Sequence, residues 1–238
     1  MLTVQRLAIV ALVFCIACKP APQAKKPAAA VAGPTVRATV ITLRTTTMPS
    51  KRTVTQTIVV AGNRARDTSE RDAWRLYDTK ARTVTFVDDV DRTARTQTFD
   101  ALAKSRRDVL ASAIAPYHPD PKLTRNAEKK TIQGVSAEQW VIASGAYKRE
   151  LWLGEHPAIP RGLFAMMQVS EALSSRELAP MMREIDEALL ATNAFPLVDR
   201  SEVPIGNAPM IVERSVIGVA QKDVPQAWIE VPKGYKQR

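Results

Sequence analysis

TVTQTIVVAGNRARDT (residues 53–68) and WRLYDTKARTVTFVDD (residues 74–89) are the two stretches that decide the fold. The first is rich in Thr and Val, and the second combines Thr and Val with Trp, Tyr and Phe; β-branched and aromatic residues favour β-strands. Each contains a short turn signal, such as Gly62-Asn63 between the apolar runs of the first stretch. The pattern predicts a meander of short antiparallel strands, which is typical of a sandwich, a barrel or a curved open sheet.

Strand character continues on both sides of these stretches. Val36, Ala38 and Val40 alternate with polar residues near the start of the domain, and a second set of hairpins is punctuated by Gly134 and Gly145. The further predicted strands are residues 36–41, 95–99, 129–132, 136–143, 147–153, 210–220 and 227–231.

Three stretches have helical spacing instead. They are residues 99–115, 163–173 and 176–192, the last following a capping-box pattern at residues 174–177. Its apolar stripe consists of Leu178, Met181, Met182, Ile185 and Leu189. The acidic residues Glu184, Asp186 and Glu187 are expected on its exposed face. The predicted fold class is α+β and mostly β.

The chain begins with an export signal, MLTVQRLAIVALVFCIAC (residues 1–18). Arg6 precedes an uncharged apolar run of eleven residues, Leu7–Ala17. This run is too short to span a bilayer as a helix, which takes about 20 residues, but it has the length of a signal-peptide core.

Ala17 directly before Cys18 resembles the lipobox of bacterial lipoproteins, although Cys15 replaces the usual aliphatic residue. The resemblance implies cleavage after Ala17 and acylation of the Cys18 thiol. A plain secretory peptide and an uncleaved anchor are the alternatives, and a Cys15–Cys18 disulfide is disfavoured inside an apolar run. The residue after the cysteine is Lys19 rather than Asp, which favours the outer membrane, with the domain in the periplasm.

Residues 19–35 are rich in Pro, Ala and Lys and predict a flexible tether. Residues 36–238 are then expected to form a single β-rich domain. The net charge is +10, from 34 basic and 24 acidic residues. Because the basic residues are interspersed with Thr and Asp, they indicate a solvated surface, and with export added no nucleic-acid partner is expected.

The order of four motifs along residues 38–165 resembles that of exported domains grouped with the LolA/LolB-type lipoprotein carriers. The motifs are Gly62-Asn63-Arg64, Tyr77-Asp78, Ile132-Gln133-Gly134-Val135 and Glu150-Leu151-Trp152. Val135 departs from the tyrosine that is usual in the third motif. The resemblance implies an incomplete barrel of antiparallel strands with helices covering an apolar concave face. Members of that family hold acyl chains or lipidated proteins there.

The sequence offers little for catalysis. It contains no GxSxG, P-loop or GxGxxG pattern, and its two histidines, His118 and His156, each sit beside a proline without a second metal-ligand spacing. The aspartates at 88, 89 and 91 predict a solvated turn rather than a Ca²⁺ site. We therefore expect no enzyme activity, cofactor or metal, and a hydrolase is the least favoured alternative.

An apolar ligand site is the remaining candidate. Its possible lining residues are the large apolar side chains of the strands and helices: Trp74, Trp140, Trp152, Phe164, Met166, Met167, Met181 and Met182. Plain core packing explains the same residues and is favoured for all of them. The leading hypothesis is an envelope lipoprotein that binds an acyl chain, lipid or lipoprotein without catalysis. The alternative is a lipoprotein with a fully packed core that docks an envelope partner. The oligomeric state stays open.

Overall fold

The computed structural model describes residues 33–68, 72–112, 122–145, 147–170, 179–205 and 208–238. Residues 33–238 form one compact unit. The predicted signal peptide, with Ala17 and Cys18, and the tether up to residue 32 lie outside the described residues. The division of the chain at residues 18 and 35 therefore stays a prediction.

The described residues form one twelve-stranded sheet with three α-helices and a short 3₁₀ helix. The first six strands are β1 (Thr35–Met48), β2 (Arg52–Ala61), β3 (Arg64–Asp67), β4 (Ala73–Asp78), β5 (Thr83–Asp88) and β6 (Thr93–Thr98). The others are β7 (Lys122–Ile132), β8 (Val135–Ser144), β9 (Tyr147–Glu155), β10 (Ala194–Ile205), β11 (Ala208–Pro225) and β12 (Lys236–Gln237). The helices are α1 (Phe99–Ser112), α2 (Leu163–Ser170), α3 (Ala179–Leu190) and the 3₁₀ helix η2 (Gln226–Ile229).

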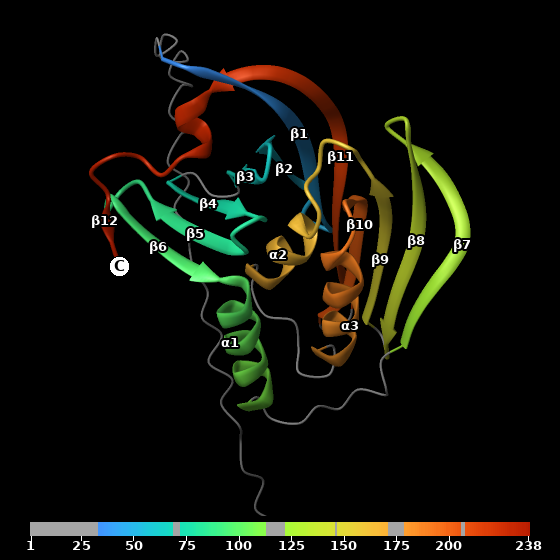
Figure 1. Cartoon of the computed structure of the whole chain (residues 1–238). Coiled ribbons are helices and arrows are strands. Elements are labelled where there is room, and N and C mark those ends of the chain that lie inside the picture. The colour runs from blue at the N-terminus through green and yellow to red at the C-terminus, as the bar shows by residue number, and fades with distance from the viewer. Residues whose placement is uncertain (1–32, 69–71, 113–121, 146, 171–178, 206–207) are drawn as a thin grey trace, which may run out of the picture. The chain divides into compact units, whose positions relative to one another are not determined.

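The strand order is β12-β6-β5-β4-β3-β2-β1-β11-β10-β9-β8-β7. The pairings are antiparallel except for β12, which runs parallel to β6. The long strands β1 and β11 lie at the centre and pair from Thr35 opposite Pro225 to Met48 opposite Ile211. One meander, β2 to β6, extends from β1, and a second, β10 back to β7, extends from β11. Figure 1 shows the resulting curved, open sheet, so the predicted mostly β architecture is confirmed.

The first meander follows the predicted strands and turns closely. Gly62 between β2 and β3 has a φ of 57°, a left-handed conformation that glycine adopts without steric cost. The expected helix after the meander is also present, because α1 begins at Phe99. Residues 122–155 form the three predicted strands of the second meander, with β7 longer than expected.

Two parts of the C-terminal third differ from the sequence prediction. Residues 227–231 were predicted to be a strand, but η2 and an extended segment occupy them. Strand β10 was not predicted, because Pro196 and a run of polar residues interrupt its apolar pattern. The register of β10 against β9 shifts between Pro196 and Val198, and this bulge accommodates a residue that has no backbone N–H to donate.

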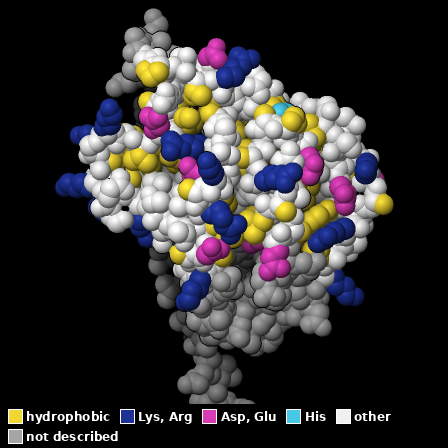
Figure 2. All heavy atoms as spheres, viewed as in Figure 1, with side chains coloured by type: hydrophobic (Ala, Val, Ile, Leu, Met, Phe, Trp, Pro, Cys, Tyr) yellow, Lys and Arg dark blue, Asp and Glu magenta, His cyan; other side chains and the backbone are white. Residues whose placement is uncertain are grey.

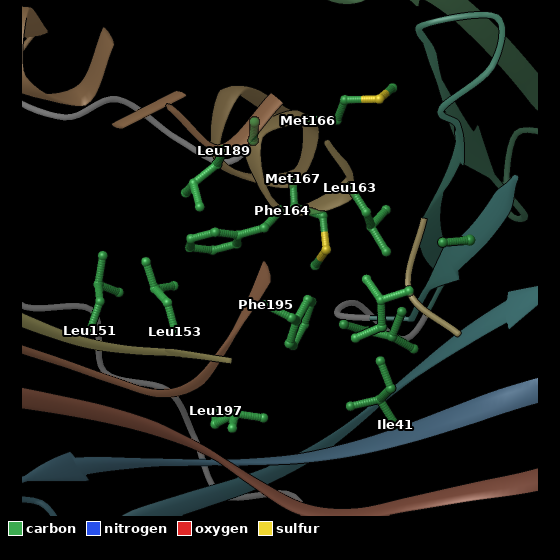
Figure 3. Packing of buried hydrophobic residues seen from close by; sticks show 14 of the residues in the cluster. Ile41, Leu151, Leu153, Leu163, Phe164, Met166, Met167, Leu189, Phe195 and Leu197 are labelled. Carbon is green, nitrogen blue, oxygen red and sulfur yellow. The ribbon is translucent and has the colours of Figure 1, made fainter. Parts of the chain in front are cut away.

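One core cluster joins strands from both meanders with the three helices. It includes Ile41 of β1, Tyr77 of β4 and Ile142 of β8, each almost wholly buried. Seven of the eight residues of α2 are buried, from Leu163 to Val169. Figure 3 shows Phe164 and Met167 of α2 directed toward the strand that carries Phe195, while Met166 leaves the helix on another side.

The opposite face of the first meander is also buried. Residues alternate along a strand between the two faces, so β4 directs Tyr77 into the main cluster and Trp74 and Leu76 to the other side. Ile229, Val231 and Tyr235 from the C-terminal segment pack on that other side. This segment therefore covers a face that the sheet alone would leave exposed.

Candidate functional site

A groove of about 960 Å³ lies between α3 and the second meander. Its walls are the end of β7, the start of β8, the end of β9 and the last turn of α3. The lining residues are Arg125, Lys129, Gln133, Gly134, Val135, Ser136, Ala137, Glu138, Trp140, Leu153, Glu155, His156, Pro157, Ala188, Leu189, Thr192 and Ala194.

The apolar part of the groove comes from three elements. Trp140 of β8 and Leu153 of β9 face it from the sheet, and Leu189 faces it from α3. The strand residues share a face because Trp140 pairs with Leu151, two positions before Leu153. Trp140, Leu153 and Leu189 all belong to the main core cluster, so the apolar floor of the groove is continuous with the core.

Gly154 keeps the sheet compact beside this floor. A Cβ atom at position 154 would lie 2.7 Å from Cγ1 of Val135 and 2.8 Å from Cδ1 of Leu197. Both distances are shorter than real carbon contacts, so these two side chains close over a position where only glycine fits without a shift.

Charged side chains surround the apolar floor. The Arg125 guanidinium lies 4.3 Å from the ring centroid of Trp140, a cation–π distance, and the Trp140 indole Nε1–H donates to Oε1 of Glu138 at 3.4 Å. Lys129 and Glu155 also line the groove. An apolar floor with a rim of both charges suits an amphiphile, whose chain is apolar and whose head is charged.

His156 lines the groove but is engaged in its own turn. Its Nδ1 accepts a hydrogen bond from the Ala158 backbone N–H at 3.2 Å, and its carbonyl oxygen accepts one from the Asn193 side chain at 3.1 Å. These contacts close the loop between β9 and α2 against the start of β10. His156 therefore has the contacts of a residue that stabilises a loop.

The structure separates the eight apolar residues that the sequence singled out. Trp140 lines the groove. Phe164, Met166 and Met167 are 2–5% exposed. Phe164 and Met167 fill the interior beneath α2, and Met166 is buried on another side of the helix (Figure 3). Met181 and Met182 lie on α3, and their side chains are outside the described part of the chain.

The other two tryptophans lie elsewhere. Trp152 is 7% exposed, and its Nε1–H donates to Oε1 of Glu150 at 2.7 Å. Trp74 belongs to a separate cluster with Leu76 and Val87, on the other face of β4 from Tyr77, and the Arg66 guanidinium lies 4.0 Å from its ring centroid. Trp74 is therefore packed away from the groove.

Sequence reasoning did not identify Leu153 or Ala188 as groove residues. The sequence placed Leu189 at the last position of the predicted apolar stripe on α3, and this stripe was the one signal that pointed to the helical wall of the groove. The strands β7, β8 and β9 that wall the groove are joined by hairpins, which the sequence did predict. Ala194 comes from β10, a strand that the sequence did not reveal.

Asp186 corrects another expectation. It was placed on the exposed face of its helix, but it is 8% exposed and its Oδ1 accepts a hydrogen bond from Nε2 of Gln168 at 3.2 Å. Gln168 lies on α2, so α3 is buried on a second side by its neighbour.

A polar contact also links β9 and β10 beside the core. The Arg149 guanidinium donates from Nε and Nη2 to the two carboxylate oxygens of Asp199, at 2.9 and 2.7 Å. Both side chains are largely buried, at 14% and 13% exposed. Burial also raises the pKa of the nearby Tyr147 hydroxyl, which Arg149 opposes in part. The pair has a structural role, because each charge neutralises the other and the contact links two neighbouring strands.

The aspartates of the β5–β6 turn accept hydrogen bonds within the turn and from its neighbours. Oδ1 of Asp88 accepts from the backbone N–H groups of Val90 and Asp91, both at 2.9 Å. Oδ1 of Asp89 accepts from Trp74 Nε1 at 3.1 Å and from the Tyr235 hydroxyl at 2.9 Å. Within the described residues, no group of three or more Cys, His, Asp and Glu side chains could hold a metal ion.

The distribution of charge agrees with a solvated surface. Figure 2 shows Lys and Arg side chains spread over the visible face with Asp and Glu among them, and strips of hydrophobic side chains between. None of the helices in the described ranges is both long enough and apolar enough to cross a bilayer.

Comparison with known proteins yields distant structural neighbours. The chain is similar to PNGF-II in two crystal forms, in space groups C2 and P21, with 10% identity and TM-scores of 0.47 and 0.43. In both forms the match covers 85% of this chain and 31% of the other, so the chain spans about a third of PNGF-II.

A LolA superfamily protein from Nitrosomonas europaea is a weaker structural neighbour. The TM-score is 0.27 at 10% identity, over 84% of this chain and 92% of that one. No model of a protein family matches the sequence, and no curated protein matches it either.

Proposed function

We propose that this chain is a lipid-anchored envelope protein whose β-rich domain binds the apolar portion of an amphiphile, without catalysis. The ligand is an acyl chain, carried by a lipid or by a lipoprotein. The groove of about 960 Å³ with Trp140, Leu153 and Leu189 in its lining is the observation that carries this proposal. Each ligand methylene buried there would contribute about 0.8 kcal/mol.

The anchor completes the proposal. Acylation of Cys18 after cleavage at Ala17 would hold the domain on the outer membrane, facing the periplasm, on a tether of residues 19–35. In this arrangement the helices cover the concave face of the sheet, and the ligand enters beside α3 rather than beneath α2. The apolar floor between charged rims supports an amphiphile over a purely apolar ligand.

One observation favours the alternative, a lipoprotein that docks an envelope partner. The interior beneath α2 is filled, since Phe164 and Met167, which point into it, are almost wholly buried. A carrier that stored its ligand there would need those side chains to move. The two functions therefore differ in whether the groove beside α3 takes up lipid.

The experiment combines lipid identification with a blocked groove. Native mass spectrometry and lipid extraction of the purified full-length protein would detect a copurifying amphiphile, and a fatty acid would be titrated against Trp fluorescence. Ala188→Arg places a long charged side chain in the groove, whereas Ala101→Arg makes the same change at an exposed position of α1.

We expect Ala188→Arg to weaken fatty-acid binding at least about tenfold, equivalent to about 1.4 kcal/mol, while Ala101→Arg binds like the wild type. If no lipid is recovered and no fatty acid binds, the proposal of amphiphile binding is wrong and the docking of an envelope partner remains. Mass spectrometry of the mature N-terminus would report the acyl groups on Cys18 separately.

A further inference from the structure

Trp228 is the exception among the four tryptophans. Its side chain is 46% exposed, whereas Trp74, Trp140 and Trp152 are 4–9% exposed. It lies on η2, the 3₁₀ helix that follows the long strand β11. An indole ring at this level of exposure presents an apolar face together with a polar N–H to the solvent.

The backbone beneath Trp228 is held firmly. The next residue, Ile229, is buried in a cluster with Ala38 and Val59. Nη1 of Arg66 donates to the carbonyl oxygen of Trp228 at 3.4 Å, and Nε2 of Gln226 donates to Oε1 of Glu230 at 2.6 Å. The indole is therefore presented to solvent from a fixed base.

Trp228 also lies beside the entry of the N-terminal chain. The Gln226 backbone N–H donates to the carbonyl oxygen of Pro34 at 2.9 Å, and Pro225 pairs with Thr35. The chain before Gly33 is the predicted tether and its acylated end. Trp228 is thus two residues along the chain from Gln226, which contacts the root of the proposed membrane anchor.

The C-terminal segment is basic in sequence. Residues 222–238 contain Lys222, Lys233, Lys236 and Arg238 against Asp223 and Glu230. Arg238 lies 3.6 Å from Asp91, so the three lysines carry the positive charge that remains. Tryptophan is enriched at membrane–water interfaces, and basic residues near a membrane are attracted to anionic headgroups by about 1 kcal/mol each. An exposed indole on a basic segment has the chemistry of a surface that contacts anionic lipid.

We infer that Trp228 and the lysines of the C-terminal segment form a second membrane contact, which docks the domain on an anionic lipid surface at the root of its tether. The inference rests on the proposed lipid anchor. The tether, at up to about 50 Å when extended, leaves the orientation of the domain free. A weak additional contact then suffices, because the anchor already keeps the domain at high local concentration near the membrane.

The same contact orients the groove. Strands β1, β10 and β8 run in the same direction, because each is separated from the next by one antiparallel strand. The starts of β8 and β10, which line the groove, therefore lie at the end of the sheet where β1 begins. Figure 1 shows this end together with η2 at the top of the view. Docking through Trp228 would bring the groove's end of the sheet toward the lipid.

The test uses the full acylated chain in vesicles that contain anionic phospholipid. One set carries brominated acyl chains, which quench only tryptophans that reach the lipid, and a matched set carries ordinary chains. Flotation of the vesicles reports the anchor, and loss of tryptophan emission reports the contact. Trp228→Phe removes the proposed reporter, and Val54→Ser alters an exposed apolar residue near the other end of β1.

We expect brominated vesicles to lower the emission of the wild type and of Val54→Ser, and to leave that of Trp228→Phe unchanged. Quenching of the wild type should weaken at high salt, because the headgroup attraction is screened. Equal emission in both vesicle sets, with flotation intact, would overturn the contact and leave the anchor standing. The same holds if Trp228→Phe is quenched as strongly as the wild type. Failure to float would overturn both.

Discussion

Arg149 and Asp199 carry opposite charges in a largely buried position, where a charge without its partner is costly. Their bidentate contact joins β9 to β10 at 2.7 and 2.9 Å. We expect Asp199→Ala to lower the free energy of unfolding by about 3 kcal/mol, because it removes the carboxylate that neutralises a largely buried guanidinium. Urea denaturation followed by circular dichroism would measure the change.

The control is the exposed pair of Arg37 and Asp223, whose side chains are 63% and 64% exposed at a distance of 3.5 Å. Asp223→Ala should cost less than about 1 kcal/mol, since solvent screens that pair. Equal costs for the two alanine variants would show that burial adds nothing to the Arg149–Asp199 contact.

Glu150 predicts an acid-sensitive contribution to stability. Burial works to raise the pKa of its carboxyl, whereas hydrogen bonds from Gln139 and Trp152 lower it. The positive charges of Lys148 and Arg200 lower it as well, and together these contacts bring the pKa below its ordinary value. The folded state therefore binds the proton less tightly than the unfolded state does.

This contribution is complete above the ordinary pKa of about 4.3 and is lost as the pH falls through the lower pKa of the folded state. Glu150→Gln removes the titration. Its free energy of unfolding should fall less steeply than that of the wild type below about pH 4.5, as measured by urea titrations at several pH values. Parallel curves for the two proteins would contradict the prediction.

Single residues were harder to place from the sequence than the strands that carry them. Alternation identified Trp74 and Trp140 as buried, but it could not say which face each would reach, because the sheet is covered on both faces in the first meander. Asp186 shows the same limit. Helical spacing assigned it to solvent, and only the packing of Gln168 on α2 reveals that this side of α3 is buried.

At the scale of elements, local signals predicted what local contacts determine. The hairpins from β2 to β6 and from β7 to β9 join neighbours in sequence, and their turns are marked by Gly and Asp. Strand β10 instead forms because it completes the sheet between β9 and β11. No signal within residues 194–205 encodes that placement, and Pro196 argues against it.

The C-terminal segment gives a prediction at this scale. Ile229 on η2 is 7% exposed and packs in the cluster with Ala38 and Val59. Ile229→Ala should lower the free energy of unfolding by about 2–4 kcal/mol through the cavity it leaves. Trp228→Phe, one residue earlier, should stay within about 0.5 kcal/mol, because it is a surface substitution.

Thermal denaturation of the two variants beside the wild type would measure this difference. A similar stability for Ile229→Ala and the wild type would mean that the C-terminal segment lies on the sheet without stabilising it. Since Trp228→Phe is also the variant used to test membrane contact, its unchanged stability would show that any loss of quenching is not a loss of fold.

At the scale of the whole molecule, the sequence predicted one β-rich domain but not how its two meanders are joined. The joint is non-local, because β1 and β11 pair across more than 160 residues of chain. The main cluster then draws Tyr77 from the first meander and Trp140 and Ile142 from the second into contact with the helices. Each meander contributes only part of this core, so neither can bury its apolar face alone.

The two meanders should consequently unfold as one cooperative unit. Trp74 reports on the first meander and Trp140 on the second, so two variants that each keep only one of these tryptophans, with Phe at the other three positions, separate the signals. In each variant we expect the urea midpoint of tryptophan emission to coincide with the midpoint of circular dichroism, as two-state behaviour requires. An emission midpoint that differs from the circular dichroism midpoint of the same variant would show that the meanders are separate folding units. In that case the groove, whose floor is continuous with the shared core, could open without unfolding the first meander.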